Sequence, residues 1–349
     1  MRNIAVLFFL LPFAGFSQKQ DGDPEKIPFK SFSLEASMLA PSQIKFPFSK
    51  IRMIDSRYDT SKLGFLPVGF FSKFKRITFK GGIAPAIEKY YADYYQHSFD
   101  SSGLELLIVM KKFWFSNVPL NKKRPGDLQQ PTNSTNFYVK WEYYLGKNDN
   151  YLPIKRIDTV WTFSEELGKY IEDEFDEKKL AGVKFILKAQ LEMLEYEKAV
   201  KAFAAQPGKT MAFINAYNAA RFQLPVLRDN SIKNGVYLNF NEFKNNNPSI
   251  SSFREKTMKY DYLKSEKYIE TLNGDDIADY WGYYKDGYLR FGKRGNDRLF
   301  RAGNTFELYL KLISNTYESP ASSGTPYGSA SRREYFYPYQ IDMETGGFY

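Results

Sequence analysis

The chain has 349 residues, with 49 Lys and Arg against 40 Asp and Glu, which gives a formal net charge of +9. The absence of cysteine excludes disulfide bonds, a thiol nucleophile and a cysteine-linked lipid. A single histidine, His97, argues against a zinc site and against a Ser-His-Asp hydrolase. The 27 Tyr and 31 Phe favour a β-rich body, because these residues suit half-buried strands; a sugar-stacking surface is the alternative.

The first 17 residues have the parts of a secretory signal peptide. Arg2 provides a positive start, an apolar run follows from Ile4 to Phe13, and Gly15 and Ser17 are small residues at a cleavage position. The run is shorter than the about 20 apolar residues that cross a bilayer. We therefore predict an exported protein, located in the periplasm or at the cell surface, whose mature form has lost Arg2 and carries a charge of +8 (9 minus 1). This charge favours anionic surfaces, lipid head groups or acidic glycans over nucleic acid, with plain solubility as the alternative.

Residues 18–163 predict an N-terminal α+β domain. A helix begins after two glycines, because Ile83, Ile87, Tyr90 and Tyr94 then share one helical face. The long apolar run in this part suits a central strand, and the last two alternating segments suit an antiparallel hairpin. The strand patterns lie at residues 29–39, 48–55, 72–80, 104–115, 136–146 and 151–163.

Residues 164–230 predict a helical connector. The segment opens with Ser164 and several acids, as helix N-termini do. An apolar stripe then recurs at spacings of three and four, which indicates a long amphipathic helix packed on a core. The stripe consists of Leu180, Val183, Leu187, Leu191 and Leu194. A second helix is predicted over residues 210–222 and ends before Pro225.

Residues 231–349 predict a β-rich domain of antiparallel hairpins. Residues 317–334 are low in complexity and predict a mobile loop before a last aromatic strand. The hairpin signals are turn pairs between aromatic strands, at Asp286-Gly287 and Gly303-Asn304. The whole chain is therefore expected to be α+β, with an N-terminal sheet-plus-helix domain, a central long amphipathic helix and a β-rich C-terminal domain.

The stretch NGVYLNFNEFKNNNPSI, residues 234–250, has a structural interpretation. The alternation after Gly235 predicts a short strand, and Asn239 or Asn241 can cap a helix of one or two turns. The asparagines before Pro248 end that helix. The alternative is a ligand loop made of asparagine amides.

The same stretch carries a resemblance to a group of proteins. Together with WGYYKDGYLRFG, LFRAGNTFELY and the closing IDMETGGFY, it resembles exported Bacteroidetes proteins of unknown function that share a GxYxxFxEFxxNxPs segment followed by aromatic hairpins. The resemblance covers residues 234–349 and implies location and a shared architecture, without an activity. A weaker resemblance lies in IRMIDSRYDTSKLGF, which looks like the opening of small envelope lipoprotein domains, although this chain lacks their lipid-carrying cysteine.

Basic residues in a predicted strand and in a later loop form a candidate anion-binding patch. They are Lys73, Lys75, Lys122, Lys123 and Arg124. A second basic segment, AAQPGKTM, resembles the end of a phosphate-binding loop at Gly208, Lys209 and Thr210. That loop needs a glycine where this chain has Phe203, and a preceding strand where it has a helix, so we reject it.

Four carboxylates are candidates for the acid and base of a glycan hydrolase, which needs two carboxyl groups roughly 5 to 10 Å apart. They are Asp55, Asp59, Asp275 and Asp276. For the first pair the structural alternative is a salt bridge to Arg57 that organises the exit of a strand. For the second pair it is the start of a helix, capped by Asn273 or Asp275.

These patterns support two hypotheses about function. The first is a non-enzymatic binding or assembly module of the cell envelope, with an envelope protein or glycan as partner and with the aromatic hairpins or residues 317–334 as the binding surface. The second is a carboxylate-dependent glycan hydrolase. A hydrolase requires two carboxylates facing one cleft, whereas a binding module requires an exposed aromatic or basic patch. We expect no cofactor, no metal site, no nucleic-acid partner and no transmembrane segment in the mature chain.

Overall fold

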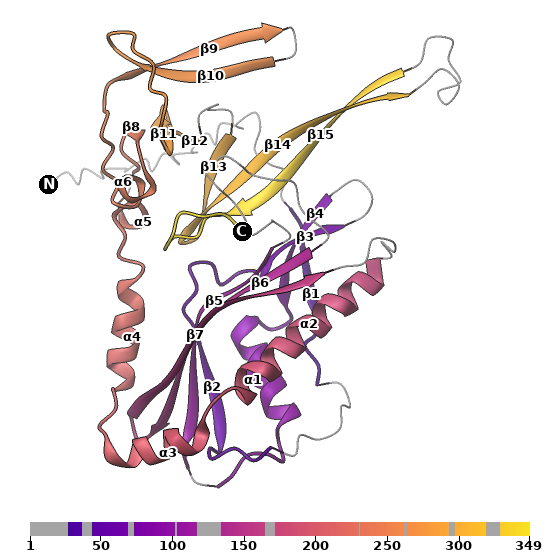
Figure 1. The fold of residues 1–349 in the computed structure, drawn as a ribbon, viewed down its shortest axis with the longest axis vertical. Helices are drawn as coiled ribbons and strands as arrows, with labels where there is room; N and C mark the ends of the chain where they lie inside the picture. Colours follow the sequence, from indigo (N-terminus) through magenta and orange to yellow (C-terminus); the bar gives the residue numbers. More distant parts are fainter. Residues whose placement is uncertain are drawn as a thin grey trace, which may run out of the picture.

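The computed structural model describes residues 27–36, 44–68, 73–101, 103–116, 134–164, 172–229, 231–261, 264–292, 297–318 and 329–349. The fold is α+β, as predicted, and two β-sheets follow each other along the long axis of the molecule (Figure 1). The predicted signal peptide and the loop residues Lys122, Lys123 and Arg124 lie outside the described residues.

The first sheet is mixed and is built around one buried central strand, β5. Its strands are β1 (Phe29–Phe32), β2 (Lys50–Asp55), β3 (Gly64–Val68), β4 (Lys73–Phe79), β5 (Glu105–Ser116), β6 (Ser134–Lys147) and β7 (Asn150–Ser164). Their order is β1-β4-β3-β5-β6-β7, and β2 also pairs with β5. All but one of the residues of β5 are buried, as the predicted central strand requires.

A β-bulge interrupts β5 between Met110 and Lys112, where its register against β6 shifts. Before the bulge, Ile108 and Met110 belong to the core under the helices, and after it Phe113 does so. The extra residue leaves Lys111 and Lys112 next to each other on the side away from those helices, since Lys111 contacts Tyr217 and Lys112 bonds to Asp342. Bulges commonly redirect side chains in this way.

Three helices cover one face of the first sheet. They are α1 (Ile83–Tyr94), α2 (Glu172–Glu192) and α3 (Tyr196–Ala205). The predicted apolar face of α1 is confirmed, because Ile83, Ile87 and Tyr90 are buried in the sheet core. The predicted stripe of the long helix joins the same core, so α2 and α3 pack with the first sheet.

The second sheet is antiparallel throughout. Its strands are β8 (Gly235–Tyr237), β11 (Gly282–Lys285), β12 (Tyr288–Phe291), β13 (Asp297–Ala302), β14 (Thr305–Glu318) and β15 (Ser329–Gln340), in the order β15-β14-β13-β12-β11-β8. The predicted turn between β11 and β12 is confirmed, with positive φ at Asp286 (51°) and Gly287 (84°). The second predicted turn joins β13 to β14 at Gly303.

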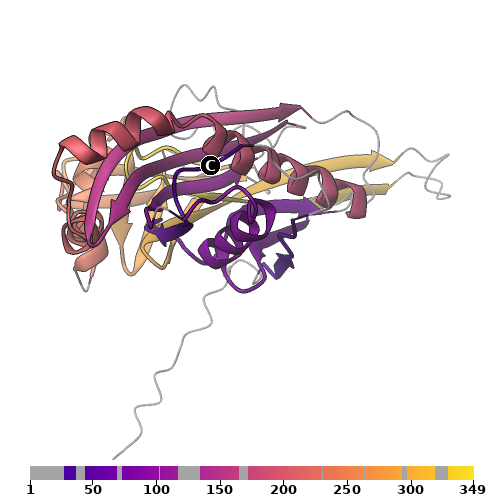
Figure 2. The same cartoon turned by 90° about the horizontal axis from the view of Figure 1, so that it is seen from below.

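The loop predicted at residues 317–334 is wrong at both ends. Tyr317 pairs with Ala330 and Glu318 with Ser329, so β14 and β15 continue into the predicted loop, and residues 319–328 lie outside the described part. The long β14–β15 hairpin reaches beyond the body of the molecule, on the side where α2 begins (Figures 1 and 2).

Another hairpin, β9 (Phe253–Asp261) and β10 (Lys264–Thr271), forms a separate two-stranded sheet at one end of the molecule (Figure 1). Two helices, α4 (Met211–Ala220) and α5 (Pro225–Arg228), connect the first sheet to the second, and α6 (Phe240–Lys244) follows β8; all three lie along one margin of the molecule (Figure 1). Within the described ranges, no helix has the length and apolar composition needed to cross a bilayer.

Candidate functional site

The candidate anion-binding patch is only partly within the described structure. Lys73 and Lys75 lie in β4, opposite Val68 and Leu66 of β3. Lys75 is half-buried and has interaction partners within the protein. Because the other three basic residues lie outside the described ranges, the patch remains a prediction.

Asp55 forms the salt bridge that the sequence analysis gave as its structural alternative. Its two oxygens accept hydrogen bonds from Nε and Nη2 of Arg57, at 2.9 and 2.7 Å. The buried guanidinium also donates to the carbonyl oxygens of Lys62 and Phe113, at 2.8 and 3.2 Å. The pair therefore fixes the chain as it leaves β2, and the Asp55 carboxylate is fully engaged.

Asp59 is also engaged within the protein. One carboxylate oxygen accepts from the backbone and hydroxyl of Ser61, at 2.8 and 2.6 Å, and the other accepts from Lys62. Burial by itself raises the pKa of Asp59, but Lys62 and Ser61 outweigh burial and hold the pKa below its usual value. A general acid requires a raised pKa, so this carboxyl group does not suit that role.

Asp275 and Asp276 lie on an exposed turn, and the helix predicted there is wrong. The backbone nitrogen of Asp275 donates to Oγ1 of Thr271 at 3.2 Å, which closes the turn after β10. Asp276 forms an isolated bridge with Glu270. Both residues are exposed, as expected for a surface turn.

The two large sheets meet at a set of ion pairs that we call the charged seam. Its carboxylates come from the C-terminal part and its cations come from the preceding residues. Glu307 pairs with Lys62 (2.6 Å) and Arg76 (3.0 Å), Asp342 with Lys112 (2.7 Å), and Glu344 with Lys140 and Arg221 (2.7 Å). The three carboxylate side chains are between 3% and 23% exposed, so these pairs are largely desolvated.

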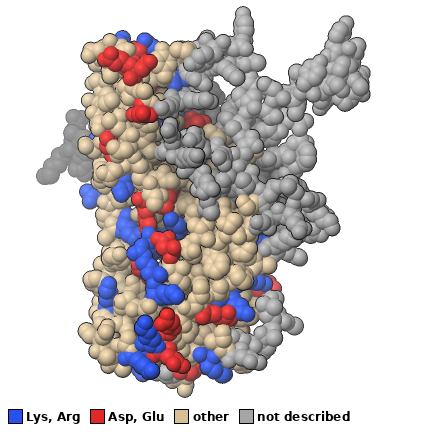
Figure 3. Space-filling view, in the orientation of Figure 1, with Lys and Arg blue, Asp and Glu red and all other residues tan. Residues whose placement is uncertain are grey.

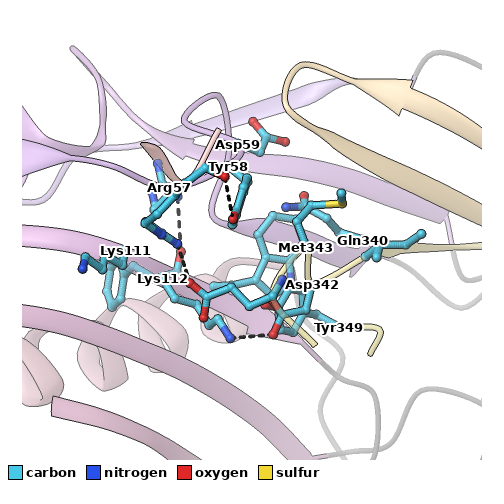
Figure 4. A pocket seen from close by; sticks show the side chains of 14 residues that line it. Arg57, Tyr58, Asp59, Lys111, Lys112, Gln340, Asp342, Met343 and Tyr349 are labelled. Atoms are coloured by element: carbon cyan, nitrogen blue, oxygen red, sulfur yellow. Dashed lines mark hydrogen bonds and ion pairs between the residues drawn. The ribbon is translucent and has the colours of Figure 1, made fainter. Parts of the chain in front are cut away.

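A cavity of about 30 Å³ lies in the charged seam. Figure 4 shows Lys111 and Lys112 on one side of it and Gln340 and Asp342 on the other. Oε1 of Gln340 is buried and has no hydrogen-bond partner among the described residues. The volume corresponds to about one water molecule. A sugar ring does not fit, so the cavity does not suit a glycan hydrolase.

Helix α4 presents an aromatic surface that the sequence analysis did not single out. Thr210 caps the helix by accepting a hydrogen bond from the nitrogen of Phe213 at 3.2 Å. Only Ile214 and Asn218 of the helix are buried, and Ile214 joins a small core on the first sheet. The rings of Phe213 and Tyr217 are 50% and 49% exposed.

Lys209 completes this surface. Its Nζ lies 4.8 Å from the ring centre of Phe213 and 5.9 Å from that of Tyr217, within the range of cation–π attraction. We call Lys209, Phe213 and Tyr217 the α4 platform. The spacing of four residues is visible in the sequence, because positions i, i+4 and i+8 share one helical face. The helix over residues 210–222 was predicted, but the pattern does not show which of its faces is exposed, so the platform was not predicted.

The glycine beside Lys209 has a packing role. A Cβ at Gly208 would lie 2.5 Å from the carbonyl carbon of Tyr151 in β7, and the nitrogen of Gly208 donates to Oδ1 of Asn150 at 2.6 Å. Lys209 then exchanges two backbone hydrogen bonds with Tyr151, each 2.8 Å long. These contacts hold the start of α4 against the edge of the first sheet.

Residues 234–250 have the structural role that their pattern predicted. Asn239 caps α6 by accepting from the nitrogen of Glu242 at 3.0 Å. The amide of Asn246 is buried and fully used: Oδ1 accepts from the Lys233 nitrogen at 2.9 Å and the Tyr237 hydroxyl at 3.1 Å, and Nδ2 donates to Asp229 at 2.7 Å. The central amide of the stretch is therefore not available to a ligand.

The part of the chain that the structure describes contains no group of three or more His, Cys, Asp or Glu residues that could hold a metal ion. Comparisons with known proteins also supply no assignment. No protein-family model matches the chain, and neither the curated proteins nor the solved structures include a match.

Proposed function

We propose that the protein is an exported, non-enzymatic binding module of a bacterial envelope and that it binds its partner through the α4 platform. The export signal at residues 1–17 supports the location. The half exposure of Phe213 and Tyr217 on one face of α4, with Lys209 beside both rings, is the observation that carries the binding role.

Two adjacent half-exposed rings differ from the scattered apolar residues that every protein surface has. Aromatic side chains supply large contact area with little loss of conformational freedom, and they are enriched where proteins bind partners. The ammonium of Lys209 has no carboxylate partner among the described residues, so it is available to an anionic group.

Packing explains only part of this surface. The inner side of Tyr217 covers the ammonium of Lys111, which lies 4.5 Å from the ring centre and forms a buried ion pair with Glu142 at 2.6 Å. Shielding a buried ion pair from water is a structural role for Tyr217. Phe213 has no such neighbour in the described structure beyond Lys209, so its position supports a role in binding.

The alternative, a glycan hydrolase, has less support. Asp55 and Asp59 are held by Arg57 and Lys62, and Asp275 and Asp276 lie on an exposed turn. The retaining and inverting mechanisms both need two carboxyl groups that act on one sugar. The cavity of the charged seam is too small for this.

The test is affinity capture from native envelope extract, using the chain from Gln18 onward. We compare the wild type, the Phe213→Ala/Tyr217→Ala double variant and the control Phe185→Ala, whose ring is 54% exposed on α2. Protein, lipid and sugar in the eluates are identified by mass spectrometry. A ligand retained by the wild type and the control but lost by the double variant supports the proposal. Equal retention by all three overturns the role of the α4 platform.

A second assay tests the wild-type protein for hydrolysis of glycans. Release of reducing ends from envelope glycan is measured for the wild type and for Asp55→Asn/Asp59→Asn. Release that disappears in this double variant supports the hydrolase and contradicts a non-enzymatic protein, whereas no release by the wild type supports the binding module.

A further inference from the structure

We infer that the ligand of the α4 platform is an anionic lipid surface, on which α4 lies with its outer face. This inference rests on the proposed binding function and names the chemistry of the partner. Three observations carry it: the composition of the outer face, the position of α4 in the molecule and the charge of the surrounding chain.

The outer face of α4 is almost free of polar groups. The helix has the sequence MAFINAYNAA, without a charged residue. Its exposed positions are Ala212, Phe213, Asn215, Ala216, Tyr217, Ala219 and Ala220. A site for a sugar or another small polar ligand needs several placed hydrogen-bonding groups to orient it. Apart from the Tyr217 hydroxyl, Asn215 is the one exposed polar side chain here, so this face suits the interfacial region of a lipid layer better than a glycan.

Helix α4 lies at the margin of the molecule, beside the first sheet and below α5 and α6 (Figure 1). Its inner residue Ile214 packs on Leu107 and Val109 of β5, which fixes the direction of the outer face. A flat surface can therefore approach along the length of the helix. Interfacial helices bind in this orientation, with aromatic and apolar residues entering the head-group boundary.

The chain around α4 is basic. Residues 196–249 contain seven Lys and Arg (Lys198, Lys201, Lys209, Arg221, Arg228, Lys233 and Lys244) and three Asp and Glu (Glu197, Asp229 and Glu242). Two of these cations have carboxylate partners outside this stretch, since Arg221 pairs with Glu344 in the charged seam and Lys198 pairs with Glu195. Lys209, Arg228 and Lys233 are exposed. Basic residues beside an apolar helix face are attracted to anionic head groups.

Charged side chains of both signs lie on the face of the molecule that Figure 3 shows. Over the lower half of this view, Lys and Arg side chains lie among Asp and Glu side chains. Mixed charge of this kind gives little attraction to a surface of one sign. We therefore assign the attraction to the exposed Lys209, Arg228 and Lys233 near the ends of α4 and not to the net charge of this face.

The experiment measures co-sedimentation of the chain from Gln18 onward with vesicles of phosphatidylcholine, with and without about a third of phosphatidylglycerol. We expect binding to the anionic vesicles that weakens as salt is raised. Phe213→Ala and Tyr217→Ala are each expected to lower the partition coefficient about fivefold. Each substitution removes the free energy gained when the exposed half of an aromatic ring leaves water for the lipid layer. Lys209→Gln is expected to lower it about fivefold on anionic vesicles only.

Two matched controls lie on other helices. Phe185→Ala removes a ring of similar exposure from α2, and Lys89→Gln removes an exposed charge from α1. Both are expected to bind as the wild type does. Tyr217→Phe keeps the ring that covers Lys111 and is expected to retain binding, and thermal unfolding shows whether each variant is folded.

The outcomes separate this inference from the proposed function. If the wild type does not co-sediment with either kind of vesicle, the lipid inference is overturned. The proposed binding function still stands if the wild type captures a protein or a soluble glycan through Phe213 and Tyr217. If folded Phe213→Ala/Tyr217→Ala sediments with anionic vesicles like the wild type, the inference is overturned. If that variant also captures the same ligand from extract, the proposed function fails with it.

Discussion

The ammonium nitrogen of Lys62, in the loop before β3 of the first sheet, lies 2.6 Å from Oε1 of Glu307 in β14 of the second sheet. Their side chains are 2% and 3% exposed. Glu307 also accepts from Arg76 of β4, and Arg76 donates to the hydroxyl of Tyr309 at 2.9 Å. This buried cluster fixes how β14 sits against the first sheet, because each charge there needs its partner.

We expect Glu307→Ala to lower the free energy of unfolding by about 3–5 kcal/mol, since it leaves Arg76 without its carboxylate and removes one of the two carboxylates that pair with buried Lys62, the other being Asp59. The measurement is urea unfolding followed by fluorescence. Asp93→Ala is the control, because it breaks the exposed Lys89–Asp93 pair and is expected to cost less than about 1 kcal/mol. Equal losses in the two variants would contradict a dominant role for the buried cluster.

The charged seam makes the protein sensitive to acid. Burial raises the pKa of Asp342, but Lys112 outweighs burial and keeps that pKa below its usual value, and Lys140 and Arg221 do the same for Glu344. A carboxyl group with a lowered folded pKa stabilises the fold above its ordinary pKa, near about 4. That contribution is lost as the pH falls through the lowered value.

Asp342→Asn tests this pH dependence. We expect the variant to be less stable than the wild type at pH 7, and the difference to shrink once the pH falls below about 4. Urea midpoints at several pH values between 7 and 2 measure the difference. A gap that stays constant over this range would show that the carboxylate charge is not the source of the stabilisation.

Asn246 should be the most sensitive residue of the stretch 234–250. Asn246→Ala leaves the backbone nitrogen of Lys233 without its acceptor and Asp229 without the amide donor, and we expect a loss of about 2–4 kcal/mol. Asn247→Ala is the neighbouring control, because its side chain is exposed, and we expect less than about 0.5 kcal/mol. Comparable losses would mean that the amide network is not what stabilises this turn.

Substituting alanine for glycine should destabilise the protein at Gly208 and stabilise it at Gly182. Gly208→Ala places a methyl group 2.5 Å from the backbone of Tyr151, so α4 must move away from β7, and we expect a loss of about 1–3 kcal/mol. Gly182→Ala in α2 meets only ordinary contacts at 3.7 Å and beyond, and we expect a gain of up to about 1 kcal/mol. Thermal unfolding of both variants gives the sign.

Local patterns predicted the elements whose cause is local. The long apolar run gave β5, the recurrence of Ile83, Ile87 and Tyr90 gave α1, and Asp286-Gly287 gave a tight turn with positive φ. Each of these depends on residues a few positions apart. The α+β class follows from such elements, because their number and type can be read along the chain.

The failures have identifiable physical causes. The helix predicted to start at Asn273 or Asp275 is a turn, because Oγ1 of Thr271 accepts a hydrogen bond from the nitrogen of Asp275 and the same residue types serve turns and helix caps. The β9–β10 hairpin was missed, because its strands are rich in charge and lack an alternating apolar face. Residues 317–334 read as a loop by composition, but pairing between β14 and β15 overrides composition at both ends.

The candidate site was harder to predict than the fold. Asp55 and Arg57 are two positions apart, and their salt bridge was anticipated from that proximity. The charged seam joins residues such as Lys112 and Asp342 that only the folded chain brings together, and the bulge that redirects Lys111 has no signature in the run LELLIVMKKFWF. The spacing of Lys209, Phe213 and Tyr217 can be read from the sequence, but the exposure of their side chains depends on how α4 packs in the folded chain.

The one-sided origin of the charges in the seam has a consequence for the order of folding. All five cations precede residue 231 and all three carboxylates follow it. A chain that folds from its N-terminus forms the first sheet while β14 and β15 are still absent. During that interval the first sheet exposes a basic surface that its own later residues will cover. Acidic molecules encountered then compete with the chain's own carboxylates, so the step at which the two sheets dock is the one most open to interference.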